Sequence, residues 1–238
     1  MPEEEFKQQT SKEADFSQVQ YLIFDRDGTL FDSQETYTQV FCELLQQNFG
    51  IDSEKARKYY LETFGKHLGA QFQEAVFKFA GQQIKSEELE AAFWDLVKEE
   101  PAKLLHGAAE TLKELKRRGY KIAVWTNARL DVLEAKTKEF GLDRFVDFQI
   151  SEAIGGGRET KGPVLFERVA KHFGITPAVL SHKAVVIGDG ERDIEAGNLC
   201  NALTIGITTG TKGEEELRNA GAKLIINRLP ELLEILKR

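Results

Sequence analysis

The apolar positions of this chain follow two different patterns, and the change between them divides it into segments. Residues 21–24, Tyr-Leu-Ile-Phe, form a short apolar run that is typical of a strand covered on both faces of a sheet. From residue 101 onward, expected helices at 108–118, 131–140, 163–174 and 193–199 alternate with expected strands at 120–125, 146–150, 183–187, 203–207 and 223–226. A short helix is expected after the last strand. This alternation predicts an α/β fold with a doubly wound, parallel, Rossmann-like sheet.

The segment between the first strand and residue 101 has a helical pattern throughout. Helices are expected at 38–49, 53–64 and 86–98, with glycines between the apolar stretches. Its large aromatic side chains are expected to form the core of a small helical bundle: Phe72, Phe77, Phe79, Phe93 and Trp94. The sequence therefore predicts a Rossmann-like core at 19–34 and 101–238, an inserted all-helical domain at 35–100, and a polar N-terminal extension at 1–18.

Composition narrows the class of protein without identifying it. The chain is 41% hydrophobic and 30% charged, which is ordinary for a soluble globular protein. Its net charge of -7 argues against nucleic acid or an anionic membrane as the main partner. Cys42 and Cys200 are too few for a disulfide framework or a cysteine-rich zinc site. No long apolar run predicts a membrane span, and the polar start does not resemble a secretory signal, so we expect a cytoplasmic protein.

The most informative motif follows the first expected strand. Asp25-Arg26-Asp27-Gly28-Thr29-Leu30 places two carboxylates one residue apart at the strand end. Extended residues at i and i+2 point the same way, so both carboxylates are expected to face the same region. Gly28 allows a sharp turn without a steric penalty from a Cβ atom. Because ligands of open α/β sheets gather at the carboxyl ends of strands, we expect the chemistry of the protein here.

Three further clusters occur at expected strand ends or helix starts. Thr126-Asn127 follows the strand at 120–125, Lys161 precedes the helix that Pro163 opens, and Gly188-Asp189 with Asp193 follows the strand at 183–187. Each alone has an ordinary explanation, because such residues are common in turns, caps and solvent-facing positions. Four clusters in this order, at equivalent ends of one sheet, favour a common site.

These clusters together resemble the four motifs of the haloacid dehalogenase-like superfamily, and in particular its phosphatases with a helical cap, similar to phosphoglycolate phosphatases. The resemblance covers the chain from residue 21 to about residue 210. It implies that Asp25 is the nucleophile, which forms an aspartyl-phosphate, and that Asp27 is the general acid and base. Dehalogenases of the superfamily lack the second carboxylate, so Asp27 favours phosphate-ester chemistry.

The resemblance also implies a bound Mg²⁺ ion and a set of groups around the phosphate. A few carboxylates, a backbone carbonyl and a phosphate oxygen suit this ion. The implied metal ligands are Asp25, Asp27 through its backbone carbonyl, and Asp189, with Asp193 in support; the implied phosphate-binding residues are Thr126, Asn127 and Lys161.

Three positions depart from the common family pattern. Arg26 stands where an apolar residue is usual, and the resulting Asp-Arg-Asp-Gly-Thr is similar to that of the capless histidinol-phosphate phosphatase-like branch. The long segment before Thr126 nevertheless predicts a cap. Gly162 separates Lys161 from the following proline, and Gly190 stands where Ser or Thr is common. The departure at Arg26 has no functional explanation from the sequence.

Two regions are candidates for substrate specificity. The segment Phe64-Gly65-Lys66-His67-Leu68-Gly69 resembles the specificity loop of phosphoglycolate phosphatase-like members, so Lys66 or His67 could bind an acidic or hydroxylated leaving group. An exposed turn between helices is the ordinary explanation of the same residues. Arg129, shortly after Asn127, is a further candidate for contact with a substrate carboxylate or hydroxyl.

We therefore expect a magnesium-dependent phosphatase that acts on a small soluble phosphate monoester, with phosphoglycolate or a sugar phosphate as the leading substrates. A phosphomutase of the β-phosphoglucomutase kind shares every core residue and is one alternative. A non-catalytic binding or regulatory module that retains the fold is another. The sequence leaves open whether the protein is a monomer or a homodimer.

Overall fold

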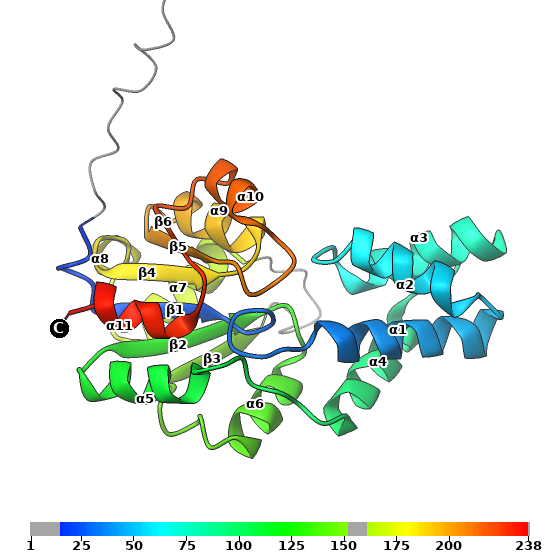
Figure 1. Cartoon of the computed structure of the whole chain (residues 1–238), viewed down its shortest axis with the longest axis horizontal. Helices are drawn as coiled ribbons and strands as arrows, with labels where there is room; N and C mark the ends of the chain where they lie inside the picture. The colour runs from blue at the N-terminus through cyan, green and yellow to red at the C-terminus, as the bar shows by residue number, and fades with distance from the viewer. Residues whose placement is uncertain (1–14, 152–160, 238) are drawn as a thin grey trace, which may run out of the picture.

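Six parallel strands form the central sheet in the computed structural model of the chain, which describes residues 15–151 and 161–237 (Figure 1). In chain order the strands are β1 (Tyr21–Asp25), β2 (Lys121–Thr126), β3 (Phe148–Ser151), β4 (Ala184–Gly188), β5 (Leu203–Ile207) and β6 (Leu224–Ile226). Their spatial order is β3-β2-β1-β4-β5-β6. The sheet confirms the predicted α/β, Rossmann-like fold class. Of the predicted N-terminal extension at 1–18, residues 1–14 lie outside the described part of the chain.

Helices cover both faces of the sheet because alternate strand residues point to opposite sides. Leu22 and Phe24 of β1 face a core shared with α5 (Ala108–Arg117), α6 (Leu130–Glu139) and α11 (Leu232–Ile235). Ile23 faces the other side, where α7 (Pro163–His172), α8 (Pro177–Lys183) and α9 (Glu191–Leu199) pack. The strands are therefore apolar on both faces, as the run at 21–24 predicted.

The remaining elements complete the region around the sheet. The helix α10 (Glu214–Asn219) lies against β5 and β6, and a 3-10 turn, η3 (Leu229–Glu231), precedes α11. The sequence patterns did not predict α8 or α10. They also placed the start of the fourth strand one residue early, since Lys183 ends α8. None of the helices in the described residues has the length and apolarity required to cross a membrane.

Four helices between β1 and α5 form a second, helical lobe beside the sheet (Figure 1). They are α1 (Gln34–Phe49), α2 (Ser53–Glu62), α3 (Leu68–Ala80) and α4 (Glu87–Glu99). This helical lobe has a hydrophobic core of its own, in which Phe41 stacks on Phe72 with ring centroids 4.7 Å apart. Val132 of α6 also joins that core, so the two lobes are in contact.

The prediction that Phe77 lies in the core of the helical lobe is wrong. The side chain of Phe77 is 60% exposed, whereas Phe72 and Phe93 are completely buried and Phe79 and Trp94 are partly buried. Phe77 comes five residues after Phe72, which places it about 140° around α3 from the buried face. Aromatic content predicted burial here, but the helical period decides which face a side chain occupies.

Candidate active site

The carboxyl ends of β1, β2 and β4 meet at one edge of the sheet and position the predicted motifs together. Asp25 ends β1 and pairs in register with Trp125 of β2, directly before Thr126. On the other side of β1, Phe24 pairs with Ile187 of β4. The chain builds β1, β2 and β3 outward and then returns to place β4 on the opposite side of β1. Such a reversal opens a crevice at the strand ends, which is where ligands of this fold class bind.

A buried acidic cluster with one lysine occupies that edge. Carboxylate oxygens of Asp25, Asp189 and Asp193 all lie within 4.8 Å of one another, and all three residues are buried. The Nζ atom of Lys161 donates to Asp25 Oδ1 at 2.5 Å and to Asp193 Oδ1 at 2.8 Å. Asp193 Oδ2 also accepts from the backbone N–H of Gly190 at 3.3 Å. The structure thus brings together four residues that the sequence predicted from three separate motifs.

The charges in this cluster perturb one another strongly. Burial and the neighbouring Asp193 raise the pKa of Asp25 well above its usual value, although Lys161 opposes this. Burial, again with Asp193, raises the pKa of Asp189 to about 7. Burial alone would lower the pKa of Lys161, but Asp193 and Asp25 outweigh it and raise that pKa. Three carboxylates against one ammonium leave an excess of negative charge that a cation would relieve.

Close backbone approach explains two glycines around Asp189. A Cβ atom on Gly28, whose φ is +77°, would lie 2.3 Å from Asp189 Oδ2. A Cβ atom on Gly210, in the loop after β5, would lie 1.7 Å from the same oxygen. Thr29 Oγ1 donates to Asp189 Oδ1 at 3.3 Å, and Thr209 Oγ1 donates to the carbonyl of Gly28 at 2.6 Å. The two loops therefore enclose Asp189 so closely that a side chain at either glycine would displace the Asp189 carboxylate.

Asp27 has different surroundings from Asp25. Its Oδ1 atom accepts from Arg26 Nη1 at 2.5 Å and from the hydroxyl of Tyr37 at 2.9 Å. Its Oδ2 atom accepts from Thr126 Oγ1 at 3.3 Å. Thr126 Oγ1 in turn accepts from the backbone N–H of Ala128 at 3.0 Å, which holds its hydroxyl toward Asp27. Thr126, at the end of β2, therefore connects the second motif to the first by its hydrogen bond to Asp27.

Asn127 and Gly162 occupy loop positions beside these groups. Asn127 is exposed and follows β2 directly, at the same sheet edge as Asp25. Gly162 has a φ of +137° and precedes the first residue of α7. This conformation is unfavourable for other residues and turns the chain between Lys161 and Pro163. The extra residue in the third motif is thus accommodated while Lys161 remains in the acidic cluster.

The predicted specificity turn lies over the site. A small pocket is bounded by Gly28, Asp189, Thr209 and Gly210 from the sheet side and by Phe64 from the turn between α2 and α3. The nearby Lys66 is paired with Glu74 at 3.0 Å, and His67 Nδ1 accepts from the N–H of Gly69 at 3.2 Å as the N-cap of α3. Both predicted residues have partners in the protein, and their contact with substrate stays a prediction.

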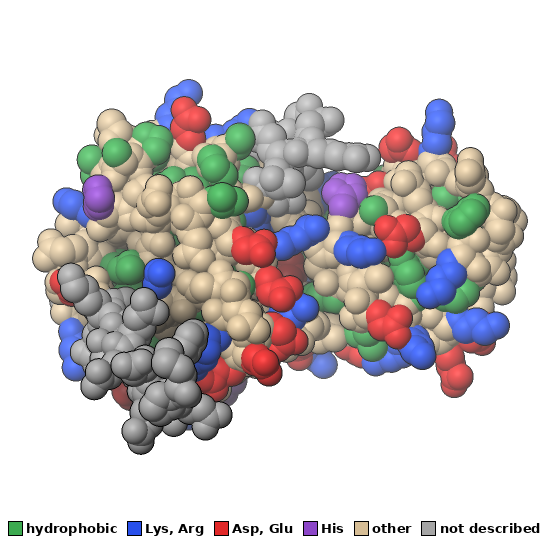
Figure 2. Space-filling model, turned by 90° about the horizontal axis from the view of Figure 1, so that it is seen from above, with side chains coloured by type: hydrophobic (Ala, Val, Ile, Leu, Met, Phe, Trp, Pro, Cys, Tyr) green, Lys and Arg blue, Asp and Glu red, His purple; other side chains and the backbone are tan. Residues whose placement is uncertain are grey.

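Arg129, the third predicted specificity residue, joins the two lobes. Its guanidinium contacts Asp95 of α4 at 2.6 Å and Asp131 of α6 at 2.5 Å. Asp131 also pairs with Lys98 of α4 at 2.8 Å. Acidic and basic side chains gather along the boundary of the lobes in Figure 2. The structure therefore gives Arg129 an ionic role between the lobes, and its contact with substrate stays a prediction.

The acidic cluster has the chemistry that a divalent cation requires. Its clustered carboxylate oxygens are hard ligands of the type that Mg²⁺ prefers, and Lys161 compensates only part of their charge. The glycines at positions 28 and 210 leave the space beside Asp189 free of side-chain carbon. The residues present therefore fit a divalent metal ion.

Comparison with known proteins identifies the class to which this fold and site belong. The sequence matches the family of haloacid dehalogenase-like hydrolases over residues 19–201, so the chain belongs to that family. Its relatives include the pyrophosphatase PpaX of Listeria welshimeri, which is 26% identical over 219 residues that cover 91% of this chain and 95% of the relative.

Solved structures agree with this assignment. A predicted phosphatase from Clostridium acetobutylicum is 28% identical, with a TM-score of 0.76, over 92% of this chain and 98% of its own. A predicted phosphoglycolate phosphatase from Haemophilus somnus is 22% identical, with a TM-score of 0.78, over 94% of this chain and 100% of its own. The second likeness supports the fold alone.

Several residues around the site were not predicted. Tyr37, Thr209 and Gly210 contact or enclose it, but they come from α1 and the loop after β5. No local sequence pattern marks them. Arg26 did carry a signal, because a charged residue beside a buried strand requires a buried partner.

Proposed function

We propose that the protein is a magnesium-dependent phosphatase that hydrolyses a small phosphate ester through an aspartyl-phosphate. The observation that carries this proposal is the separation of the two motif carboxylates. Asp25 is buried beside Lys161 and the acidic cluster, whereas Asp27 is held by Arg26, Tyr37 and Thr126. Different surroundings suit one carboxylate as nucleophile and the other as acid and base.

The proposed reaction has two displacements at phosphorus. In the first, a carboxylate oxygen of Asp25 forms a bond to phosphorus while the bond to the leaving oxygen breaks, and Asp27 gives that oxygen a proton. In the second, Asp27 takes a proton from water as the water oxygen bonds to phosphorus. The bond between Asp25 and phosphorus then breaks, which regenerates the Asp25 carboxylate and releases inorganic phosphate.

The other residues of the site provide charge and hydrogen bonds. Asp25, Asp189 and the backbone carbonyl of Asp27 would hold Mg²⁺, with Asp193 in support. When bound, this ion supplies positive charge that offsets the charge of the phosphoryl oxygens. Lys161 adds a second positive charge, and a buried ammonium is most effective in such a water-poor site. Thr126 and Asn127 would donate hydrogen bonds to the phosphate when it is bound.

Two substrate classes are supported by different observations. The turn that contributes Phe64 to the pocket beside Asp189 resembles that of phosphoglycolate phosphatases, which favours phosphoglycolate or a sugar phosphate. The curated relatives are named as pyrophosphatases, which favours inorganic pyrophosphate as the second candidate. All these substrates carry the phosphoryl group on a small, anionic or hydroxylated leaving group.

The test is a phosphate-release assay with phosphoglycolate, sugar phosphates and pyrophosphate, with and without Mg²⁺. We expect metal-dependent release that Asp25→Asn lowers by at least about a thousandfold, because removal of a nucleophile eliminates the covalent route. Asp143→Asn, an exposed carboxylate remote from the motifs, is the matched control and should retain full activity. Undiminished release by Asp25→Asn would refute the mechanism. Phosphoryl transfer to a phosphosugar in place of water would identify a mutase.

A further inference from the structure

Arg26 is a completely buried cation next to both motif carboxylates. Its side chain is 2% exposed, and its guanidinium carbon lies 4.6 Å from the centre of the Phe31 ring. Nη1 donates to Asp27 Oδ1 at 2.5 Å and to the hydroxyl of Tyr37 at 2.6 Å. Burial of a guanidinium is costly unless its partners are well placed, so these contacts define its position closely.

Tyr37 completes a triangle with Arg26 and Asp27. Its hydroxyl accepts from Arg26 and donates to Asp27 Oδ1 at 2.9 Å. The ring belongs to the helical lobe, because Tyr37 lies on α1 and packs edge-on against Phe93 and Trp94 of α4. The Asp27 carboxylate is therefore held by Arg26, its neighbour in the sequence, and by Tyr37 of the helical lobe.

We propose that Arg26 and Tyr37 are positioning residues that fix the orientation of the Asp27 carboxylate. The proposal rests on the proposed role of Asp27 as general acid and base. Two short hydrogen bonds anchor Oδ1, whereas Oδ2 makes one longer contact, with Thr126 at 3.3 Å. Oδ2 is consequently the oxygen that exchanges protons with the leaving group and with water. It faces the end of β2, where the phosphate is proposed to bind.

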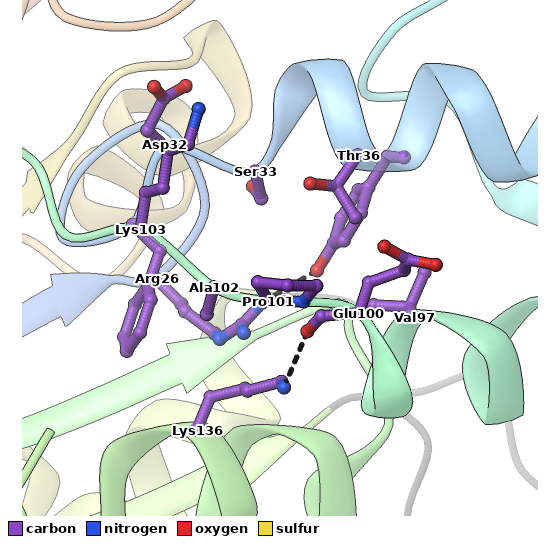
Figure 3. Close-up of a pocket in the computed structure, with 12 residues that line it drawn as sticks. Arg26, Asp32, Ser33, Thr36, Val97, Glu100, Pro101, Ala102, Lys103 and Lys136 are labelled. Atoms are coloured by element: carbon purple, nitrogen blue, oxygen red, sulfur yellow. Dashed lines mark hydrogen bonds between the residues drawn. The ribbon is translucent and has the colours of Figure 1, made fainter. Parts of the chain in front are cut away.

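The position of Arg26 links this function to the helical lobe. Arg26 lines a small pocket whose walls include both chain connections to that lobe, residues 32–33 and 100–103 (Figure 3). Among the described residues, Arg26 Nε and Ser33 Oγ are buried there without a hydrogen-bond partner. The arginine thus lies at the junction of the lobes and contacts the carboxylate that we assign to proton transfer. A displacement of α1 relative to the sheet would move Tyr37 and with it the anchor of Asp27.

Two substrates separate a positioning role from a structural one. The leaving group of p-nitrophenyl phosphate needs little protonation, so formation of the aspartyl-phosphate from it depends weakly on Asp27. Hydrolysis of the aspartyl-phosphate needs a positioned base in every case. An alkyl ester such as phosphoglycolate needs Asp27 in both steps. A defect in Asp27 orientation therefore has a kinetic signature that damage to Asp25 or to the metal ligands does not produce.

The experiment compares Arg26→Met, Arg26→Lys and Tyr37→Phe with wild type and with Asp27→Asn. For p-nitrophenyl phosphate we expect Arg26→Met to lower kcat and KM together by about 100-fold, with kcat/KM kept within about threefold. Rapid mixing should show a burst near one p-nitrophenolate per active site. For phosphoglycolate, kcat/KM itself should fall by about 100-fold. Tyr37→Phe should cause the same pattern with a smaller amplitude, and Arg26→Lys should restore part of the loss.

Arg118→Met is the matched control. Like Arg26, Arg118 forms an ion pair with a carboxylate, that of Glu114, and it also donates to the carbonyls of Leu233 and Leu236, away from the site. It should change none of these kinetic parameters. Unchanged kcat in both Arg26→Met and Tyr37→Phe, or an equal loss of kcat/KM for both substrates without a burst, overturns the proposal. If Arg26→Met does not fold, Tyr37→Phe decides the matter alone. Absence of metal-dependent release by wild type, or full activity of Asp27→Asn, refutes the proposed function instead.

Discussion

At the scale of single residues, Asp25 and Asp27 show how sequence neighbours acquire different chemistry. Extended geometry predicts that both carboxylates face the same region. Their partners nevertheless differ: Lys161 contacts Asp25, whereas Arg26 and Tyr37 contact Asp27. The motif alone specifies the two acids, and the tertiary fold gives each of them different partners.

The buried carboxyl group of Asp189 should make the free energy of unfolding of the metal-free protein depend on pH. Burial raises its pKa in the folded protein to about 7, from 3.8, so the folded protein binds a proton that the unfolded chain has already lost. The free energy of unfolding of metal-free protein should therefore fall as pH rises from about 5 to 7.5, by on the order of a few kcal/mol. Urea unfolding at several pH values, in the presence of a chelator, measures this slope.

Asp189→Asn removes the ionisable group while keeping its shape. At pH 7.5 without metal we expect this variant to be more stable than wild type, with a shallower dependence on pH, because no charge has to be buried. Saturating Mg²⁺ should stabilise wild type by binding the folded state, and it should stabilise the variant much less. An unaltered slope in Asp189→Asn would contradict the assignment of the pH dependence to this carboxylate.

At the scale of elements, the sequence predicts the strands better than the short helices. The apolar runs at β1, β4 and β5 are unambiguous because both faces of a parallel sheet are covered. In contrast, α8 and α10 span only seven and six residues, too few for a helical period to stand out. The motifs at the ends of β1, β2 and β4 were located correctly for the same reason that the strands were.

Helix α3 allows a direct test of which face is buried. Phe72 is completely buried against Phe41 and Phe93, whereas Phe77 is 60% exposed. Phe72→Ala should lower the free energy of unfolding by about 3–5 kcal/mol, because it leaves a cavity in the helical lobe. The identical truncation at the exposed position, Phe77→Ala, should change it by less than about 0.5 kcal/mol. Equal losses in denaturant unfolding would contradict the orientation of α3.

At the scale of the whole molecule, the contacts between the lobes were beyond the reach of the sequence. Arg129 and Asp95 lie 34 residues apart, and Lys98 and Asp131 lie 33 residues apart. Neither pair has a local spacing that marks it. Arg129 was predicted to contact substrate because it follows the second motif, yet its position also brings it within reach of α4. Arg129 can therefore act by contacting the substrate or by pairing with α4, and these two roles predict different effects of mutation.

The ionic contact between Arg129 and Asp95 should affect substrate binding through the placement of the helical lobe. We expect Asp95→Asn and Arg129→Met to change KM for phosphoglycolate in the same direction and without additivity. The coupling should be about 0.2–1 kcal/mol, since the pair is partly exposed to solvent. Salt at about 0.5 M should remove the difference from wild type. Glu99→Gln, an exposed acid on the same helix, should have no effect.

The KM values of Asp95→Asn and Arg129→Met distinguish an ionic contact between the lobes from direct recognition of the substrate by Arg129. If Asp95→Asn leaves KM unchanged while Arg129→Met raises it only for substrates with a carboxylate, then Arg129 contacts the substrate itself. If both variants shift KM equally for carboxylate and sugar substrates, the arginine acts through α4. Because α4 packs on Tyr37, that outcome would also connect the lobe boundary to the anchor of Asp27, and it predicts that Asp95→Asn alters the p-nitrophenolate burst as Tyr37→Phe does.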